Sequence, residues 1–384
     1  MWVERLELVD FRSYRSAELD LTQGVTVLVG PNGRGKTNIV EALHRVAVGA
    51  SHRIAGDAAL VREGATDAVV RTALRTDDDR RRSVDVQIGS GRTRAQVDGR
   101  PVRRAAEAVG VLRVIAFAPE DLALVRGDPA DRRRYLDQLL SQRRASYAAA
   151  LADHDRVLRQ RNSLLKDLRG RDARAQGADA TLDAWTEQLV AHGAPLVAAR
   201  LAAVDALRGP VAEAHQRLTG SDVPVTLTYR SDADVTLPDG RAKDVAAITD
   251  ALRDAVRAVA PEELRRGLTL VGPHRDELVI TLDGLPARTT ASQGEAWSVA
   301  LACKVGSAPL LTGVGDRPVL LLDDVFSELD ETRRDRVAAL CDGFEQVIVT
   351  AAVDADVPLP GRRVGVRRGD GGSGSTLHPD GGAA

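Results

Sequence analysis

A glycine-rich segment at residues 30–37 constrains the fold of this chain more than any other stretch. It reads Gly-Pro-Asn-Gly-Arg-Gly-Lys-Thr and fits the phosphate-loop pattern G-x-x-x-x-G-K-S/T at every fixed position. An apolar run at 25–29 precedes it, and a helical pattern that ends near Val48 follows it. In such a strand–turn–helix unit, backbone N–H groups and the positive end of the helix dipole converge on one anion. We therefore predict a nucleotide-binding loop.

Each part of this loop has an expected role in binding ATP with Mg²⁺. The glycines allow the unusual backbone angles that aim successive N–H groups at a phosphate. Lys36 is expected to reach the terminal phosphates, and the Thr37 hydroxyl to ligate Mg²⁺. The residues expected to contact ATP are Gly30, Pro31, Asn32, Gly33, Arg34, Gly35, Lys36 and Thr37.

A second apolar run, residues 318–322, ends on two carboxylates, Asp323 and Asp324. The pair could simply be a polar turn at a strand end, but that leaves the strongly apolar strand unexplained. A magnesium-bound nucleotide needs one acid in the metal shell and a second that orients or deprotonates the attacking water. We expect Asp323 to be a metal ligand, and Asp324 and Lys36 to be the catalytic residues. Because most of the chain separates Lys36 from Asp323, the nucleotide domain must be split in sequence.

Two further motifs each have a structural and a functional interpretation. Residues 292–295 read Ser-Gln-Gly-Glu and open a predicted helix that runs to about residue 311, so they form a capping box. The same helix start could bind an anion through Ser292 and Gly294, which a dimer that sandwiches nucleotide across its interface requires. Arg12 and Tyr14 could be ordinary turn residues or could border the nucleotide.

Periodicity predicts the other elements. Alternation gives strands at 2–9 and 17–21 and an antiparallel meander over 68–98, and an apolar strand is expected at 111–117. Helical periodicity dominates from about 118 to 218, with a polar break at 170–177. The elements expected after that are strands at 223–229, 268–271 and 278–282 and helices at 245–259 and 261–267. We therefore expect an α/β head, residues 1–126 and 262–368, a mainly helical inserted arm, residues 127–261, and a disordered glycine-rich tail, residues 369–384.

Charge suggests a nucleic-acid surface only locally. The net charge is −2, whereas residues 126–174 contain 13 Lys or Arg against 7 Asp or Glu. The chain has 53 cationic residues but only four lysines, so a general arginine bias lowers the weight of any single one. The cationic arm could be a solvated helix face or a phosphate-tracking surface. The candidate DNA contacts are Arg132, Arg133, Arg143 and Arg144.

Composition places limits on the cellular context. The two cysteines, Cys303 and Cys341, fall in predicted helices and are expected to be buried reduced thiols. The N-terminal residues alternate like a strand and lack the pattern of a signal sequence. No apolar run was found that approaches the roughly 18 residues of a membrane span. We expect a cytoplasmic protein without a membrane partner.

The order of these parts resembles that of the ABC-type ATPases of chromosome maintenance and, more narrowly, the RecF family of bacterial recombination mediators. The phosphate loop alone is shared with many families, but the set is specific and covers nearly the whole chain. The segments that carry the resemblance are 11–14, 30–38, 117–121, 124–127, 132–137, 272–276, 292–295 and 322–330.

The resemblance implies an α/β ATPase head like those of SMC proteins, with a short helical arm in place of a long coiled coil. It implies roles for Ser292 and Gly294 on the partner subunit's γ-phosphate, for Asp330 at the dimer interface and for Arg12 near the nucleotide. Thr350 stands where transporter ATPases carry a switch histidine, and Glu120 where other ABC ATPases use a glutamine.

The function implied is an ATP-dependent DNA-binding protein of repair, replication restart and the SOS response. Such a protein dimerises on ATP, clamps single-stranded or gapped duplex DNA and hydrolyses ATP slowly as a switch. RecR and RecO are the implied partners in loading a recombinase. Two alternatives are an SMC-like protein that holds DNA through a long arm, and the ATPase subunit of a membrane transporter. The arm is too short for the first, because each helix spans roughly 60 Å at most.

Overall fold

The computed structural model of the protein describes residues 1–51, 53, 56–89, 91–169, 179–237, 242–313, 315–327, 329–369 and 374–378. The chain forms two compact units, each assembled from separate stretches of sequence. The first unit contains Met1–Leu122, Gly209–Pro224 and Ser292–Ala384, and the second contains Ala123–Arg208 and Val225–Ala291. The second unit thus corresponds in part to the expected arm, but it continues to Ala291 and leaves Gly209–Pro224 to the first unit.

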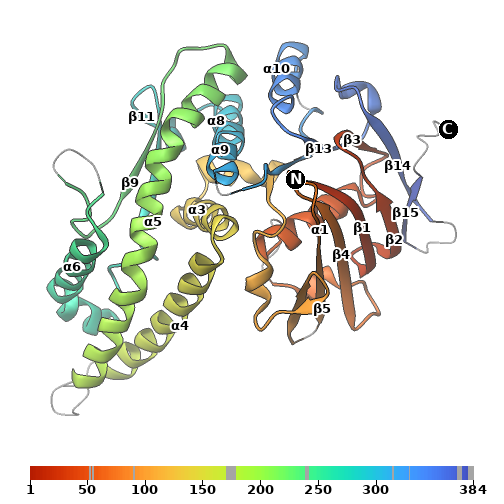
Figure 1. The fold of residues 1–384 in the computed structure, drawn as a ribbon. Coiled ribbons are helices and arrows are strands. Elements are labelled where there is room, and N and C mark those ends of the chain that lie inside the picture. The colour runs from red at the N-terminus through yellow and green to blue at the C-terminus, as the bar shows by residue number, and fades with distance from the viewer. Residues whose placement is uncertain are drawn as a thin grey trace. The chain divides into compact units, whose positions relative to one another are not determined.

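A mostly parallel sheet lies at the centre of the first unit (Figure 1). Its strand order is β15-β14-β3-β13-β12-β8, and β3, β13, β12 and β8 run parallel. The central strands are continuously apolar and buried, as expected for a parallel sheet covered on both faces. The bounds are β3 (Gly24–Val29), β8 (Val114–Phe117), β12 (Val319–Asp323), β13 (Gln346–Ala351), β14 (Arg362–Arg368) and β15 (Ser375–His378).

The second sheet of this unit is antiparallel, with strand order β2-β1-β4-β5-β6-β7. Its apolar side chains alternate toward the core, so the predicted N-terminal strands and the meander are confirmed. Helix α1 (Lys36–Val48) packs between the two sheets and is buried along most of its length. The bounds are β1 (Trp2–Phe11), β2 (Tyr14–Asp20), β4 (Asp67–Arg75), β5 (Arg81–Gly89), β6 (Thr93–Val97) and β7 (Arg100–Pro101).

The remaining helices of the first unit follow the parallel sheet. Helix α8 packs on β8, where Trp297 meets Phe117 edge to face at 5.4 Å between ring centroids. The single helix expected to reach residue 311 is two, since Gly306 ends α8 before α9 begins. Both cysteines are buried and free, as predicted. The bounds are α8 (Gln293–Val305), α9 (Ala308–Thr312) and α10 (Glu331–Cys341).

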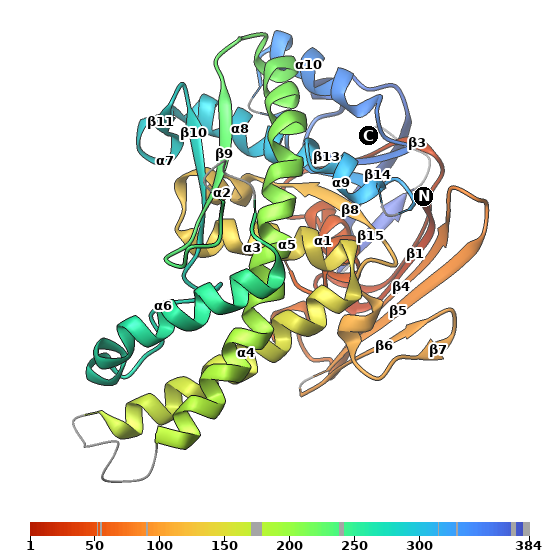
Figure 2. The same ribbon diagram turned by 60° about the vertical axis from the view of Figure 1, so that its left-hand side comes forward.

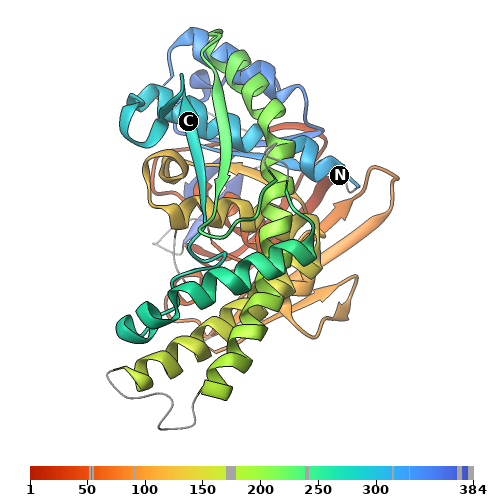
Figure 3. The same ribbon diagram turned by 90° about the vertical axis from the view of Figure 1, so that its left-hand side faces the viewer.

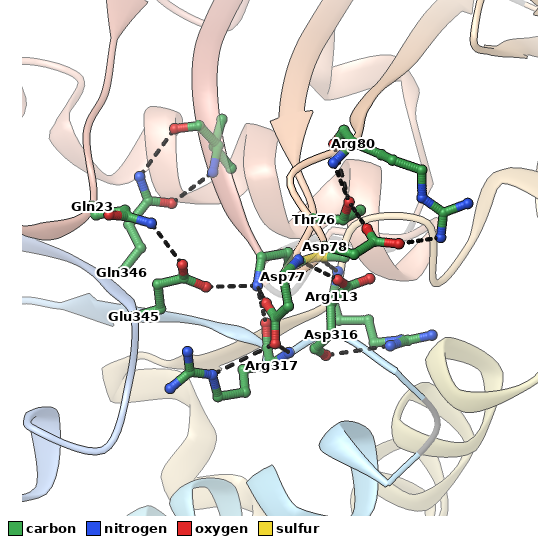
Figure 4. Close-up of polar contacts among 12 residues, drawn as sticks. Gln23, Thr76, Asp77, Asp78, Arg80, Arg113, Asp316, Arg317, Glu345 and Gln346 are labelled. Atoms are coloured by element: carbon green, nitrogen blue, oxygen red, sulfur yellow. Dashed lines mark hydrogen bonds and ion pairs between the residues drawn. The ribbon is translucent and has the colours of Figure 1, made fainter.

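A polar network joins strand ends of the two sheets (Figure 4). The main-chain nitrogen of Met1 contacts Asp77 in the β4–β5 turn and donates to Glu345 Oε2 at 2.8 Å, just before β13. Asp77 also accepts from the backbone N–H of Arg317 at 3.3 Å. Burial raises the pKa of Asp77, but these contacts and the charges of the Met1 amino group and Arg317 outweigh it, so the pKa lies below its usual value. The network fixes the start of β1 against the loops that lead into β12 and β13.

The second unit combines long helices with a three-stranded antiparallel sheet, β11-β10-β9, and α4 and α5 lie side by side in it (Figure 3). Helix α4 has 24 residues and spans about 36 Å, and α5 has 41 and spans about 60 Å. Part of α5, from Gly209 onward, belongs to the first unit. The bounds are α2 (Ala123–Arg126), α3 (Pro129–Arg143), α4 (Ala145–Leu168), α5 (Asp179–Thr219), α6 (Val245–Arg266), α7 (Ala287–Thr290), β9 (Val225–Arg230), β10 (Glu277–Leu282) and β11 (Leu285–Pro286).

Buried arginines tie the helices of the second unit together. Arg161 on α4 bonds Glu263 on α6 at 2.6 Å and the Thr269 hydroxyl at 2.8 Å. Arg200 on α5 forms two bonds of 2.9 Å with Asp137 on α3. Both guanidinium groups are at most 2% exposed, so losing either partner would leave an uncompensated buried charge.

Three further expectations about elements are wrong, and one lies outside the described residues. The helices expected at 245–259 and 261–267 are one helix, α6, which continues through Pro261. Residues 268–271 form no strand. Part of the expected disordered tail, Ser375–His378, is strand β15, paired antiparallel with β14. The polar break at 170–177 is not among the described residues.

Helix α5 is the one described helix that is long and apolar enough to cross a membrane, with a mean hydropathy of 1.3 in its most apolar window. The expectation that no stretch reaches this length and apolarity is therefore wrong. More than half of that window is buried within the protein, as in a core helix of a globular fold. Length and composition alone are thus weak evidence for a membrane span.

Candidate nucleotide site

The phosphate loop adopts a conformation that only glycine allows at two positions. At Gly35 φ is 106°, and an added Cβ would lie 2.6 Å from Ser375 Oγ. At Gly30 an added Cβ would lie 2.2 Å from the carbonyl oxygen of Val366 on β14. Strand β14 and the segment after it therefore press directly on the loop, and no side chain fits at either place.

Lys36 is the first residue of α1 and folds back over the loop. Its Nζ donates to the carbonyl oxygens of Gly30 at 2.6 Å and Pro31 at 3.1 Å, and to Asn32 Oδ1 at 3.3 Å. The side chain is 6% exposed. Burial lowers the pKa of Lys36, and the charges of Asp324 and Asp323 partly offset that shift. The ammonium group thus lies inside the loop, close to both acids, where a terminal phosphate would be neutralised.

Helix α1, β12 and β13 bring the expected metal ligands together. The Thr37 hydroxyl donates to Asp323 Oδ1 at 3.0 Å. The Thr350 hydroxyl donates to the same oxygen at 2.6 Å and accepts from the backbone N–H of Asp324 at 2.9 Å. One threonine on β13 therefore orients the carboxylate of Asp323 and fixes the backbone of Asp324 at the end of β12. This role was not predicted for Thr350, which the sequence marked only as the counterpart of a switch histidine.

Asp324 has an unusual backbone conformation and a buried side-chain oxygen that a ligand could satisfy. Its φ is 54°, in the left-handed region that aspartate and asparagine adopt more readily than most other residues. Its Oδ1 is buried and finds no hydrogen-bond partner among the residues that the structure describes. A buried oxygen without a partner is costly unless a ligand or water satisfies it. The orphaned oxygen, on the residue after Asp323 and close enough to Lys36 to affect its pKa, fits a magnesium nucleotide with its attacking water.

Polar side chains from β2, the turn before it and β15 form hydrogen bonds around the phosphate loop. The Tyr14 hydroxyl donates to the carbonyl of Gly35 at 3.1 Å, and Asn38 Nδ2 donates to Ser13 Oγ at 2.8 Å. Ser375 Oγ donates to Ser13 Oγ at 2.7 Å, and its backbone N–H bonds the Ser13 carbonyl at 2.9 Å. Ser375 was missed because it lies in a glycine-rich stretch without an apolar pattern.

Removing the Ser375 hydroxyl should weaken ATP binding without unfolding the protein. One lost buried hydrogen bond is worth about 1 kcal/mol, so we expect the Kd for ATP of Ser375→Ala to rise about five-fold. Titration with a fluorescent ATP analogue measures this. Thr376→Ala is the matched control, because the neighbouring Thr376 hydroxyl faces His378 rather than the loop. Equal affinities in both variants would show that Ser375 does not position the loop.

Arg12 contacts the buried acid of α1 rather than the loop itself. Its guanidinium forms two bonds with Glu41, of 2.7 and 2.8 Å, and a third with the carbonyl of Ala59 at 2.8 Å. Burial opposes the charge of Glu41, but bonds from Arg12 and Ser51 outweigh it, so the pKa of Glu41 lies below its usual value. In this structure the Arg12 guanidinium is bonded to Glu41. A contact between Arg12 and ATP would therefore have to compete with this ion pair.

Ser292 caps α8 in the way the sequence predicts. Its Oγ accepts from the Glu295 N–H at 3.3 Å, and Glu295 Oε2 accepts from the Ser292 N–H at 2.7 Å. Ser292 is exposed, and the guanidinium of Arg333 on α10 lies beside Gly294. Within the described residues, no hydrogen bond or ion pair joins Ser292 or Gly294 to the phosphate loop.

Two other residues implied by the resemblance have local partners. Asp330 caps α10 by accepting from the Arg333 N–H at 2.9 Å. Glu120 lies 3.6 Å from Arg53, whose guanidinium is also 3.9 Å from Glu41. Arg53 thus links Glu120 to Glu41 on α1 in one network of charged side chains.

The arginines proposed to bind DNA differ in exposure. Arg132 is 3% exposed and bonds Glu277 at 2.5 Å and the carbonyl of Gly127 at 3.1 Å. Arg133 donates to the Asp276 carbonyl at 2.8 Å, and burial lowers its pKa. The DNA contacts predicted for Arg132 and Arg133 conflict with this burial. Arg143 is half-buried, and only Arg144 is well exposed.

Comparisons with known proteins agree with this geometry. Residues 2–369 match the family model described as the RecF/RecN/SMC N terminal domain. A protein of Frankia alni named DNA replication and repair protein RecF is 50% identical over 374 residues, which cover 96% of this chain and 99% of that protein. A protein of the same name from Kineococcus radiotolerans is 49% identical over 371 residues, with coverage of 93% and 94%.

Solved structures give the same result. A structure described as the recombination mediator protein RecF-ATPrS in the RecFOR pathway superposes with a TM-score of 0.85 at 26% identity, covering 98% of this chain and 97% of that one. An SMC head bound to the C-winged helix domain of ScpA, with a TM-score of 0.55 and 17% identity, shares the fold alone. The expected α/β, ABC-type, SMC-head-like fold is therefore confirmed. The chain belongs to the RecF/RecN/SMC family and, within it, to the RecF group.

Proposed function

We propose that this chain is an ATP-dependent DNA-binding protein of recombinational repair and replication restart. ATP drives two copies together on DNA, slow hydrolysis releases them, and the cycle helps to load a recombinase at gaps. Its relatives at about half identity are named DNA replication and repair proteins, and solved RecF structures are described with ATP or ATPrS. The observation that carries the proposal is the buried Oδ1 of Asp324, which has no hydrogen-bond partner among the described residues. Asp324 directly follows Asp323, which bonds Thr37.

The residues of the site divide the work of a slow ATPase. When bound, Mg²⁺-ATP supplies the phosphoryl group that is transferred to water. Lys36 and the loop N–H groups would neutralise the terminal phosphates, and Thr37 and Asp323 would hold the metal. Asp324 orients the attacking water and accepts its proton at Oδ1. Thr350 holds the carboxylate of Asp323 and the backbone of Asp324 in place before ATP arrives.

One copy of the chain contains only half of each complete site. Ser292 and Gly294 lie at a helix start that suits an anion but has no bond to the chain's own phosphate loop among the described residues. A second copy would bring them to the γ-phosphate, with Asp330 beside them. This arrangement couples dimer formation to the presence of the third phosphate, because ADP offers no group for Ser292 to bind.

Ser292→Arg should block ATP-dependent dimerisation and leave nucleotide binding intact. The larger side chain would occupy the space of the partner's γ-phosphate, while the chain's own loop is untouched. Sedimentation velocity with ATP and with ADP separates monomer from dimer. Thr289→Arg, at an exposed position three residues earlier, is the control and should dimerise as the wild type does. Dimers of Ser292→Arg with ATP would disprove the trans contact.

The central experiment is sedimentation of the wild type with ATP or ADP, with and without gapped DNA. We expect a dimer on DNA only with ATP, and an ATPase rate that DNA increases but that stays slow. An SMC-like holder would stay on DNA whichever nucleotide is bound, and a transporter subunit would hydrolyse rapidly without DNA. RecR and RecO are the proposed partners, the cytoplasm the proposed location, and the SOS response the proposed context.

A further inference from the structure

A group of exposed arginines lies at one edge of the antiparallel sheet of the first unit. It comprises five side chains on and around β6 and β7, named here the edge arginines: Arg92, Arg94, Arg100, Arg103 and Arg104. These two strands end the sheet opposite β2, and Figure 2 shows them at its outer edge. Val97 on β6 faces Arg100 on β7, so the strands form one short hairpin that carries the group.

The edge arginines differ from the other arginines of the same sheet. Elsewhere on the sheet, arginines pair with nearby acids: Arg5 and Arg71 with Glu7, Arg75 and Arg81 with Glu4, Arg80 with Asp78 and Arg82 with Asp98. Among the described residues, none of the edge arginines forms an ion pair with an acid. The nearest acids are already used: Asp98 binds Arg82 and the N–H of Ser83, and Glu107 accepts from the backbone N–H of Arg104.

A general arginine bias does not explain this contrast. Such a bias would add paired and unpaired arginines alike over the whole sheet. Among the described residues, five unpaired arginines instead lie together at one edge, and the opposite edge has a single one, Arg15 on β2. Charged residues at a sheet edge also protect against strand pairing between molecules. That role accounts for Arg94 and Arg100, but Arg103 and Arg104 follow the last strand and protect no edge. A dense, unneutralised group of guanidinium ions indicates an anionic partner.

We infer that the edge arginines bind the phosphate backbone of duplex DNA. This inference rests on the DNA binding proposed above, and it moves the contact surface from the buried Arg132 and the half-buried Arg133 to this edge. Duplex DNA carries a negative charge every 1.7 Å along its axis, so a line of cations can neutralise several phosphates at once. Residues 89–107 contain no aromatic side chain on which unpaired bases could stack. The edge therefore suits the duplex flanking a gap rather than the single strand within it.

The test compares two variants with the same change in charge. The edge variant carries Arg94→Gln, Arg100→Gln, Arg103→Gln and Arg104→Gln. The control carries Arg5→Gln, Arg71→Gln, Arg80→Gln and Arg81→Gln, which removes four paired arginines from the same sheet. Duplex and single-stranded oligonucleotides are titrated with each protein and ATP at several salt concentrations. ATP affinity, measured in parallel, shows whether each variant is folded.

We expect the edge variant to bind duplex at least about ten-fold more weakly at 100 mM salt. The slope of log affinity against log salt should fall by about 3 to 4, since each lost phosphate contact removes about 0.9. The control should retain the wild-type slope to within about one unit, and single-strand binding should change less than duplex binding. ATP affinity should be unchanged in both variants.

Two other results would overturn the inference, and they are distinguishable. Wild-type duplex affinity and slope in the edge variant would mean that DNA lies elsewhere and that these arginines serve another anionic partner, such as an acidic protein. Equal losses in edge and control variants would mean that total charge matters and not this surface. In both cases the proposed function survives. A wild-type protein that binds no duplex with ATP would remove both proposals together.

Discussion

Lys36→Ala will abolish ATP-dependent behaviour while leaving the protein folded. The Lys36 ammonium lies inside the loop, where it bonds the carbonyls of Gly30 and Pro31. With ATP bound it would be the nearest positive charge to the terminal phosphates, so its loss would leave their negative charge without a partner. Removing one member of a buried charge pair costs about 2–5 kcal/mol, which is roughly 30-fold to several thousand-fold in affinity. We expect the Kd for ATP to rise by at least about 30-fold, and both dimerisation and DNA binding to become independent of ATP.

Calorimetric ATP titration and DNA binding with and without ATP measure these effects. Lys304→Ala is the matched control: it is a lysine of the same unit, 12% exposed and paired with Asp121 at 2.8 Å. It removes the same charge without touching the loop, so ATP affinity should remain near that of the wild type. ATP-dependent DNA binding that persists in Lys36→Ala would refute the nucleotide switch.

Asp324→Asn should separate ATP binding from hydrolysis. Asparagine is isosteric with aspartate and tolerates the left-handed backbone at this position, so the change removes a charge and little else. The amide cannot accept the proton of the attacking water, and loss of a positioned base costs about 10²–10⁴ in rate. We expect single-turnover hydrolysis to fall by at least about a hundred-fold while ATP still drives dimerisation.

The trapped state gives a second measurement. Because hydrolysis resets the switch, the Asp324→Asn protein should stay on DNA far longer after excess ATP is removed. Thr350→Val tests the positioning network independently, since it removes the hydroxyl that bonds both acids. It should slow hydrolysis less than Asp324→Asn does and should weaken the response to Mg²⁺ concentration. Normal turnover in Asp324→Asn would mean that another group is the base.

The sequence predicts the loop and the acid pair because each is a short local pattern. In both, the binding of phosphate and Mg²⁺ requires particular residues at fixed positions. Apolar strands on either side fix where Lys36 and Asp323 emerge, and parallel pairing brings those strand ends to one edge of the sheet. Ser375 gave no such signal. Its strand forms only because β14 offers a partner, and pairing between distant segments leaves no mark in the composition of a short polar stretch.

The burial of Arg132 has a different cause. A run of three arginines suggests a solvated face, yet Arg132, Leu136 and Leu139 follow at helical spacing and share the buried side of α3. Pro261 led to the opposite error, because a helix boundary was predicted where α6 is continuous. Proline usually ends a helix, but Glu263, fully buried and bonded to Arg161 and to the N–H of Leu270, holds the following turn in place.

The strand order of the parallel sheet also has a consequence for biosynthesis. Strand β3, which leads into the phosphate loop, pairs only with β13 and β14, whose residues follow it by more than 300 positions. At 5–20 residues per second, a ribosome needs roughly 15–60 s to supply those partners. During that interval β3 is an apolar strand with both edges open, which is a hazard for aggregation. The nascent chain should therefore depend on chaperones until its last strands emerge.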